Sequence, residues 1–406
     1  MSQGLANDAG RDVVLTLNAG SSSIKFALFS ARLAGAYPAA LLRGEVDGIG
    51  HVPELRARDA AGKTLVQRAL SGAHTHEEIL GQVLSWIDGA MPDVQLAAAG
   101  HRVVHGGMQF AAPVIVNTEV RAALEALVEL APLHEQHNLA AIDAVTRLHP
   151  GLPQVACFDT AFHATQPWES TALALPAEFE TQGVRRYGFH GLSYEFIASV
   201  LVEHAGDAAE GRVVVAHLGS GASMCAMQAR ASLATTMGFS ALDGLPMGTR
   251  CGALDPGVVL YLLERGWTKD ALEDLLWRRS GLLGLSGISD DVRALVASGE
   301  PRAARALGFF AYRIARELGS LAAALGGLDV LVFTAGIGEH ASSVRSEVCR
   351  LAQWLGIELD GHANERNASL ISTATSKVGV YVIPTDEESV VARHTLETLN
   401  VPHSAS

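Results

Sequence analysis

Near its start the chain reads Val13-Val-Leu-Thr-Leu-Asn18-Ala-Gly20-Ser21-Ser22-Ser23-Ile-Lys25-Phe-Ala-Leu-Phe29. Two apolar, β-prone segments here flank a turn rich in Gly and Ser, a pattern that predicts a hairpin with a polar tip. Backbone N–H groups and hydroxyls at such a tip can bind an anion, and Lys25 adds a positive charge just after it. The tip is therefore a candidate phosphate loop, although Gly/Ser turns are equally common in hairpins that bind nothing.

About half a chain later the same order of strand, Gly/Ser loop and strand returns. The second stretch reads Val213-Val-Val-Ala-His217-Leu-Gly219-Ser220-Gly221-Ala-Ser223-Met-Cys-Ala-Met227. Two such hairpins predict a duplicated domain with a nucleotide bound between the halves. Neither loop is a P-loop, because the chain has no Gly-x-x-x-x-Gly-Lys-Ser/Thr.

The composition limits the kinds of protein that this chain can be. The chain has 406 residues, of which 49% are hydrophobic and 18% charged, which fits two or three globular domains. Its four cysteines lie far apart without a Cys-x-x-Cys pair, so we expect reduced thiols and neither a disulfide framework nor a zinc site. The formal net charge of −13 argues against a nucleic-acid partner.

Nothing in the sequence predicts a signal peptide or a membrane span. The first twelve residues lack a basic region followed by an apolar run. The most apolar stretch, Leu321 to Ile337, is interrupted by Gly326-Gly327 and Asp329. We therefore expect a cytoplasmic protein without a membrane partner.

Strand and helix patterns alternate along the chain, which predicts an α/β fold. The expected helices cover residues 74–89, 118–131 and 301–325, and the expected strands cover 96–99, 154–158, 329–334 and 378–383. Polar clusters follow several of these strands: Arg102 lies between two glycine-flanked histidines, and Asp159 follows Phe158. Ligand sites in open α/β sheets tend to lie at such strand ends.

Three further features can carry chemistry or structure. His134 and His137 have a spacing that allows metal ligation, but a histidine pair without a third ligand is more often hydrogen-bonded structure. His190 stands between glycines beside two arginines and before a helix that Ser193 can cap. Arg250 lies in a Gly- and Pro-rich segment, residues 237–256, whose length predicts a functional loop.

Together these segments resemble the acetate kinase family, a branch of the acetate and sugar kinase, Hsp70 and actin superfold. The resemblance rests on seven motifs in the expected order: Asn-Ala-Gly-Ser-Ser-Ser-x-Lys at 18–25, His-Arg-Val-Val-His-Gly-Gly at 101–107, Phe-Asp-Thr-Ala-Phe-His at 158–163, Tyr-Gly-Phe-His-Gly at 187–191, Met-Gly-Thr-Arg at 247–250, Ala-Gly-Ile-Gly-Glu at 335–339 and Pro-Thr-x-Glu-Glu at 384–388. It implies two duplicated actin-like (ribonuclease H-like) domains with an interdomain active-site cleft. Residues 1–160, rejoined by a helix at 387–406, would form the first domain, and residues 161–386 would form the second and hold the adenosine pocket. The resemblance also implies a homodimer.

The implied reaction is reversible phosphoryl transfer from ATP to acetate or another short carboxylate, with Mg²⁺, or alternatively Mn²⁺, as the metal. Arg102 would hold the substrate carboxylate, Arg250 and His190 the transferring phosphoryl group, and Asp159 would help align Arg250 or the substrate. Asn18 and Glu387 would hold the metal.

The same resemblance assigns the binding residues. The alkyl group of the substrate would contact Val104, Leu133, Phe189 and Ala241. The nucleotide would contact Lys25, Ser21, Ser23, His217, Leu218, Gly219, Ser220, Gly221, Asp291, Val292, Arg293, Gly336, Ile337, Gly338, Glu339 and His340.

Several positions depart from the common family pattern, and all are neighbours of the inferred chemical residues. They are Ser220 for Asn, Asp386 for Asn, Glu135-Gln136 for Asn-Pro, His340 for Asn, Tyr194 for a second His, and Ala241 for Pro. These changes bear on rate and substrate preference more than on reaction type. Ala241 in particular leaves room for a longer carboxylate such as propionate.

Two other functions fit parts of the sequence. Gly336-x-Gly338-x-x-Ala341 after a strand, with Asp360 downstream, is compatible with an NAD-dependent oxidoreductase. A non-catalytic nucleotide-binding protein of the same superfold is the other alternative, but it would not need Arg102, His190 and Arg250 together.

Overall fold

The computed structural model describes residues 12–20, 23–33, 35–72, 75–129 and 132–399, and of residues 129 and 132–134 only the backbone. The chain divides into two compact units. Unit 1 comprises the residues up to Ala161 and those from Asp386 onward, and unit 2 comprises Phe162–Thr385.

Unit 1 is built on an eight-stranded sheet of order β5-β4-β3-β2-β1-β6-β8-β7. Its strands are β1 (Asp12–Ala19), β2 (Ser23–Leu33), β3 (Pro38–Asp47), β4 (Glu54–Asp59), β5 (Thr64–Ala69), β6 (Gln95–Val103), β7 (Val114–Ile115) and β8 (Gln154–Phe158). The predicted hairpin is confirmed, since β1 and β2 pair antiparallel with Leu17 opposite Phe26. β6 pairs parallel with both β1 and β8.

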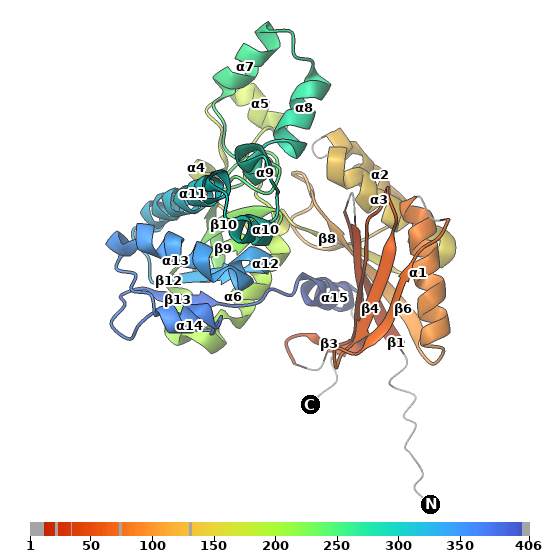
Figure 1. Cartoon of the computed structure of the whole chain (residues 1–406). Coiled ribbons are helices and arrows are strands. Elements are labelled where there is room, and N and C mark those ends of the chain that lie inside the picture. The colour runs from red at the N-terminus through yellow and green to blue at the C-terminus, as the bar shows by residue number, and fades with distance from the viewer. Residues whose placement is uncertain (1–11, 21–22, 34, 73–74, 130–131, 400–406) are drawn as a thin grey trace, which may run out of the picture. The chain divides into compact units, whose positions relative to one another are not determined.

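Helices cover both faces of this sheet (Figure 1). They are α1 (His76–Ala90), α2 (Thr118–Ala126), α3 (Pro132–Leu148) and α15 (Glu387–Thr398). Helix α1 begins with a capping box between Thr75 and Glu78 and buries the predicted stripe of Ile79, Val83 and Ile87. On the opposite face the C-terminal α15 packs Ala392 against Ala27 and Phe29, which ties the end of the chain to the first hairpin.

Unit 2 repeats the central part of this topology in a five-stranded sheet of order β11-β10-β9-β12-β13. Its strands are β9 (Arg212–Leu218), β10 (Ala222–Gln228), β11 (Ala231–Thr235), β12 (Val330–Thr334) and β13 (Gly379–Val382). β9, β10 and β11 are antiparallel, whereas β12 pairs parallel with β9 and β13. The second predicted hairpin is thus also confirmed, and β3-β2-β1-β6-β8 in unit 1 has the same order and directions.

The helices of unit 2 include α6 (Gly191–Ala205) and the long α11 (Pro301–Leu325), which pack against the sheet. The others are α4 (Trp168–Thr171), α5 (Ala177–Thr181), α7 (Pro256–Glu264), α8 (Lys269–Arg278), α9 (Gly281–Ser286), α10 (Val292–Ser298), α12 (Ala335–His340), α13 (Ser342–Leu351) and α14 (Gly361–Glu365). Helix α11 has the predicted bounds, with a proline in its first turn and Gly326 in the left-handed conformation after its last. The segment from Thr236 to Asp255 forms no helix or strand, as predicted.

Three local predictions were wrong. The helix expected over 118–131 ends at Ala126 and continues as a 3₁₀ turn, because Pro132 begins a new helix, where a proline costs no hydrogen bond. The strand expected over 96–99 extends to Val103, so Arg102 lies on β6 and not after it. Ser193 does not cap α6: the helix begins at Gly191 with His190 as its N-cap residue, and Ser193 is buried in the first turn.

Candidate active site

In unit 1 the strands β1, β6 and β8 are parallel neighbours, so their carboxyl ends lie at the same edge of the sheet. Side chains from β1, from β6 and from the residue after β8 come together there. Nη1 of Arg102 donates to Oδ1 of Asn18 at 3.0 Å. Its Nε donates to Oδ1 of Asp159 at 3.1 Å, and its Nη2 bonds the other carboxylate oxygen of Asp159. This two-point contact with a buried aspartate fixes the plane of the guanidinium at the end of the sheet.

Glu387 joins the same cluster from the N-terminus of α15. Its Oε2 lies 3.6 Å from Nε of Arg102. Burial raises the pKa of Glu387, and although Arg102 and Lys25 lower it, the neighbouring carboxylates of Glu388 and Asp386 raise it further. Asp386, Glu387 and Glu388 are consecutive in the sequence, and the nearby cations therefore compensate only part of their negative charge.

This donor set fits a magnesium ion. Asn18 and Glu387 offer an amide and a carboxylate oxygen, the hard ligands that Mg²⁺ prefers, and an added cation would relieve the repulsion that raises the pKa of Glu387. Among the described residues no group of three His, Cys, Asp or Glu forms a complete metal cage. Magnesium in nucleotide sites typically takes one or two protein ligands together with water and phosphate.

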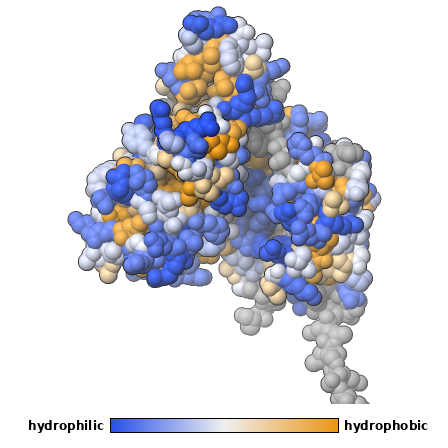
Figure 2. All heavy atoms as spheres, in the orientation of Figure 1, coloured by the Kyte–Doolittle hydropathy of each residue, from blue (hydrophilic) through white to orange (hydrophobic). Residues whose placement is uncertain are grey.

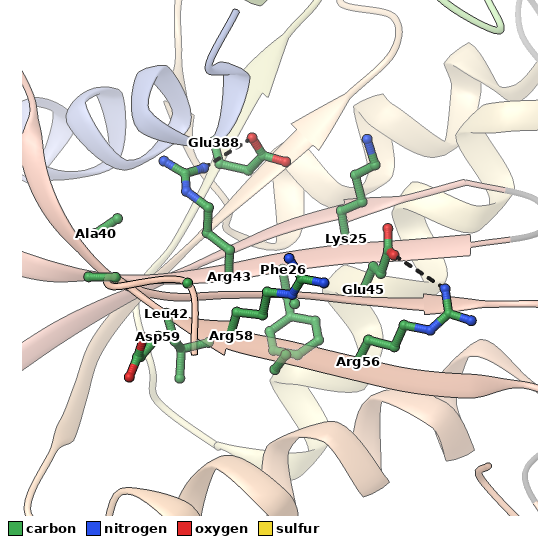
Figure 3. A pocket seen from close by; sticks show the side chains of 14 residues that line it. Lys25, Phe26, Ala40, Leu42, Arg43, Glu45, Arg56, Arg58, Asp59 and Glu388 are labelled. Atoms are coloured by element: carbon green, nitrogen blue, oxygen red, sulfur yellow. Dashed lines mark hydrogen bonds and ion pairs between the residues drawn. The ribbon is translucent and has the colours of Figure 1, made fainter. Parts of the chain in front are cut away.

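Lys25, opposite Asn18 in the first hairpin, borders a second feature of unit 1. It lines a cavity of about 740 Å³ on β2, β3 and β4 together with Arg43, Arg56 and Arg58. In Figure 3 Lys25 and Arg43 rise from the sheet on the side where Glu388 lies, whereas the ring of Phe26 points the other way. Arg43 is paired with Asp386 at 2.5 Å, so part of the positive charge of this cavity is already compensated.

The other residues predicted in unit 1 are only partly described. Val104 is buried, and its N–H donates to Oδ1 of Asn138 at 3.0 Å. Ser23 begins β2, and its carbonyl accepts from the N–H of Gly20 at 2.8 Å. Ser21 and the side chain of Leu133 lie outside the described residues.

In unit 2 His190 occupies a left-handed backbone conformation, with φ of 59°, at the start of α6. This conformation is uncommon for a residue other than glycine and turns the side chain out of the helix path. Nδ1 of His190 lies 2.8 Å from Oγ of Ser223 on β10, and its ring stacks on His217 of β9 with centroids 4.1 Å apart. His217 is in turn held by Oγ of Ser193, 2.8 Å from its Nδ1.

Arg250 is oriented by two contacts with uncharged groups of unit 2. Its Nη1 donates to the carbonyl oxygen of Ala241 at 3.0 Å, and its guanidinium lies 5.4 Å from the ring centroid of Trp277. The loop that carries it wraps around Gly281, where a Cβ would come within 2.2 Å of the carbonyl oxygen of Met247, so this position requires glycine. Sequence reasoning missed Trp277, which lies on α8 outside every motif.

His190 and Arg250 converge on the loop of the second hairpin. A Cβ atom built on Gly221 would lie 3.0 Å from Nε2 of His190 and 3.7 Å from Nη2 of Arg250. Two hydrogen-bond donors of the kind that stabilise a phosphoryl group therefore face the same stretch of backbone. The glycine allows their close approach, since a side chain there would displace the imidazole.

The opposite side of that loop opens into a cavity of about 770 Å³. Eight of the predicted nucleotide residues line it: Gly219, Ser220, Asp291, Val292, Arg293, Gly336, Ile337 and His340. Val296 and Ala297 line it as well and were missed, although they follow Arg293 by one helical turn on α10 and so share its face. Oδ2 of Asp291 pairs with Nη2 of Arg293 at 2.7 Å, and the hydrogen bonds from Arg293 lower the pKa of Asp291.

Other predicted nucleotide residues do not line this cavity. Leu218 is buried, and Gly338 packs beside the backbone of Phe333. Oε1 of Glu339 accepts from the N–H of Thr385 at 3.4 Å. Phe189 is buried and Ala241 half-buried, both in unit 2, so the four residues expected around the alkyl group come from both units.

Glu135 is a feature of unit 1 whose environment the sequence did not indicate. It is fully buried on α3, and neither carboxyl oxygen has a hydrogen-bond partner within the described part of the chain. Burial raises its pKa to about 8, a shift that the His105 backbone opposes and the charge of Asp159 reinforces. Glu135 is therefore a buried acid whose charged form is disfavoured.

Two other predictions concern metals and membranes. His137 stacks on His76 with ring centroids 4.4 Å apart, and the side chain of His134 lies outside the described residues, so the structure gives no metal site to this pair. None of the helices in the described ranges has the length and apolar character needed to cross a membrane.

Comparison with known proteins gives a consistent result. The model of the Acetokinase family matches residues 13–393. A curated acetate kinase of Rhodopseudomonas palustris is 57% identical over 387 residues, which cover 94% of this chain and 97% of that protein. The crystal structure of Porphyromonas gingivalis acetate kinase is 37% identical with a TM-score of 0.83, covering 96% of this chain and all of that one. A propionate kinase from Francisella tularensis is 32% identical with a TM-score of 0.87, covering 94% and 98% of the two chains.

Proposed function

The chain belongs to the acetokinase family, and we propose that it transfers the γ-phosphoryl group of ATP to acetate, giving acetyl phosphate and ADP. The fold is the actin-like α/β fold of the acetate and propionate kinases. This assignment replaces the oxidoreductase interpretation. Asp360, which that interpretation needs for a ribose contact, instead accepts from the N–H of Ala363 as the N-cap of α14.

The observation that carries the proposal is the loop Gly219–Gly221. One side of this loop lines the cavity bordered by Asp291, Arg293 and Gly336, and Gly221 faces His190 and Arg250. A nucleotide bound in that cavity would extend its phosphates along the loop toward two phosphoryl-binding donors. The arrangement supports direct transfer, in which the protein positions the reactants and neutralises charge.

We assign the remaining roles by chemistry. Arg102 would bind the acetate carboxylate, because its guanidinium is always charged and already planar against Asp159. Asp159 would hold Arg102 in place. Burial lowers the pKa of Arg102, but Asp159 and Glu387 raise it above its ordinary value, so the arginine stays cationic.

Mg²⁺, or Mn²⁺ in its place, would be held by Asn18 and Glu387. When bound, the ion neutralises charge on the β- and γ-phosphates of the nucleotide. Lys25, Ser21 and Ser23 of the first hairpin would line the phosphate path.

The protein is further proposed to act as a homodimer through α7. This helix has an apolar sequence yet no buried residue, and Leu260 is 61% exposed beside Tyr261 and Leu263. Figure 2 shows hydrophobic residues gathered over it. Light scattering should give twice the chain mass for the wild type and a monomer for Leu260→Glu, whereas Val52→Glu, at a still more exposed site of unit 1, should remain dimeric.

A cytoplasmic location fits this reaction, because ATP is its substrate and all four cysteines are free thiols. The proposed partners are ATP, a short carboxylate and a second copy of the chain.

The decisive experiment is a hydroxylamine trap for acyl phosphate with purified protein, ATP, Mg²⁺ and acetate. We expect acetyl hydroxamate, and its absence would overturn the proposal. Thermal shifts separate the rival interpretation, since ADP should raise the melting temperature and NADH should not.

A second substrate has a specific observation in its favour. Residue 241 is Ala where the family commonly has Pro, and a propionate kinase is among the similar solved structures. Propionate is therefore proposed as an alternative acceptor.

A further inference from the structure

Behind His190 lies a pair of buried hydroxyl groups that the proposed reaction has not used. Tyr194 and Ser223 are both fully buried, on α6 and β10. Their oxygens lie 2.5 Å apart, and Oγ of Ser223 lies 2.8 Å from Nδ1 of His190. Tyr194 is also tied to His190 along the helix, since its N–H donates to the His190 carbonyl at 3.1 Å. The three side chains form one chain of hydrogen bonds.

We propose that Tyr194 and Ser223 are positioning residues that hold the His190 imidazole with Nδ1 as an acceptor and direct its Nε2 proton at the loop of Gly221. Tyr194 donates to Ser223, and Ser223, having a single proton, then donates to Nδ1. A neutral imidazole that accepts at one nitrogen carries its proton on the other. His190 can thus donate a hydrogen bond to a phosphoryl oxygen without first becoming protonated.

The surroundings of the ring favour this arrangement. His217 of β9 stacks on one face, and the guanidinium of Arg250 approaches Gly221 beside Nε2. The phenol of Tyr194 on α6 reaches the ring through Ser223. A protonated His190 would face both a second imidazole and a guanidinium, whereas a neutral Nε2–H tautomer adds a donor without adding charge.

The proposal requires a hydrogen-bond donor at position 194, and a suitable imidazole tautomer can donate to Ser223 as the phenol of Tyr194 can. Tyr194→His should therefore keep kcat near that of the wild type, whereas Tyr194→Phe should lower it.

The inference rests on the proposed function, and its test combines turnover with spectroscopy. We expect Ser223→Ala to lower kcat on the order of 10- to 100-fold with little change in the KM for ATP, the range for groups that orient a functional histidine. Tyr194→Phe should lower kcat less, and Ser223→Thr, which keeps the hydroxyl, should restore it. Ser372→Ala is the matched control, because Ser372 is buried and its Oγ accepts from the N–H of Val380 at 3.1 Å, away from His190. It should leave kcat unchanged.

The tautomer is measured separately by long-range ¹H–¹⁵N correlation on the resting wild-type enzyme, with His190 assigned by His190→Gln. We expect Nε2 to be protonated and Nδ1 not. A protonated Nδ1, or a folded Ser223→Ala enzyme within twofold of wild-type kcat, would overturn the proposal. If Ser223→Ala fails to fold, Tyr194→Phe and the wild-type spectrum decide. Failure of the wild type to form acyl phosphate would refute the proposed function but leave the spectrum readable.

Discussion

The two units place comparable strands and hairpins around their chemical residues but hold the two key arginines differently. In unit 1 Arg102 lies against Asp159 and Glu387, both carboxylates. In unit 2 Arg250 donates to the carbonyl of Ala241 and lies near the ring of Trp277, and both of these groups are uncharged. The shared strand order shows that this difference comes from side chains and not from topology.

The contrast suggests that Arg102 and Arg250 have different roles. Carboxylates around Arg102 fix its position and offset part of its charge, which suits a residue that holds a singly charged carboxylate in place. A carbonyl and an indole help to orient Arg250, and neither of these two groups carries a negative charge, which suits a residue that meets charge developing on a phosphoryl group. Each prediction below tests one side of this comparison.

The largest effect is expected for Arg250→Leu. Turnover should fall on the order of a thousandfold while ATP still binds, because in its proposed role the arginine would stabilise the transition state more than the ground state. Steady-state kinetics and nucleotide titration measure the two effects. Arg278→Leu, which removes an exposed cation of α8, is the control. More than a tenth of wild-type turnover in Arg250→Leu would refute the role.

The next prediction concerns Glu135, a buried acid of unit 1. Glu135 is a buried acid with a pKa of about 8, against 4.5 for an ordinary Glu. As pH rises between these values the unfolded chain loses the proton while the folded chain keeps it, so folding stability falls. From pH 5.5 to 8.5 the wild type should lose about 3 kcal/mol more than Glu135→Gln.

Urea denaturation at the two pH values measures this difference. The control is Glu125→Gln, whose carboxylate is 71% exposed, and it should follow the wild type. Parallel pH dependences of the wild type and Glu135→Gln would show that Glu135 is ionised in the folded protein.

Only part of the fold and of the candidate site could be predicted from the sequence. The hairpins, the length of α11 and the strand-end positions of Asn18 and Asp159 follow from apolar patterns and glycine positions, and the family motifs supply the roles. The bond between Ser223 and His190 could not be predicted, because it depends on the register that sets Ser223 opposite His217 in the second hairpin. Glu135 could not be recognised as an acid with a raised pKa. Its burial is set by the packing of α3 against the sheet and not by the residues next to it in the sequence.

A smaller effect is expected for Glu387→Ala. Loss of its carboxylate should raise the Mg²⁺ concentration needed for half-maximal activity by about tenfold or more and leave the fold intact. A Mg²⁺ titration of initial rates measures it. Glu397→Ala, farther along α15, should titrate like the wild type. An unchanged titration for Glu387→Ala would move the metal role to Asp159 or Asp386.

The smallest effect concerns the choice of carboxylate. Ala241 has fewer side-chain carbons than the proline common in the family, which leaves space for about one methylene. One buried methylene is worth roughly 0.8 kcal/mol, or about fourfold in kcat/KM. Pocket discrimination of this size seldom exceeds one or two orders of magnitude. Acetate should therefore be a substrate, propionate should be used with comparable kcat/KM, and butyrate should be worse.

Ala241→Pro tests this directly and leaves the rest of the site in place. Proline retains the carbonyl that accepts from Arg250, and no hydrogen bond from the Ala241 N–H is present among the described residues, so the arginine should keep its orientation. The variant should shift the ratio of kcat/KM toward acetate by about fourfold, with an unchanged KM for ATP. A wild type that uses propionate a hundredfold less well than acetate, or an unchanged ratio in the variant, would show that residue 241 does not set the depth of the pocket. Leu242 or Phe239, both half-buried in the same loop, would then fill the space that Ala241 leaves.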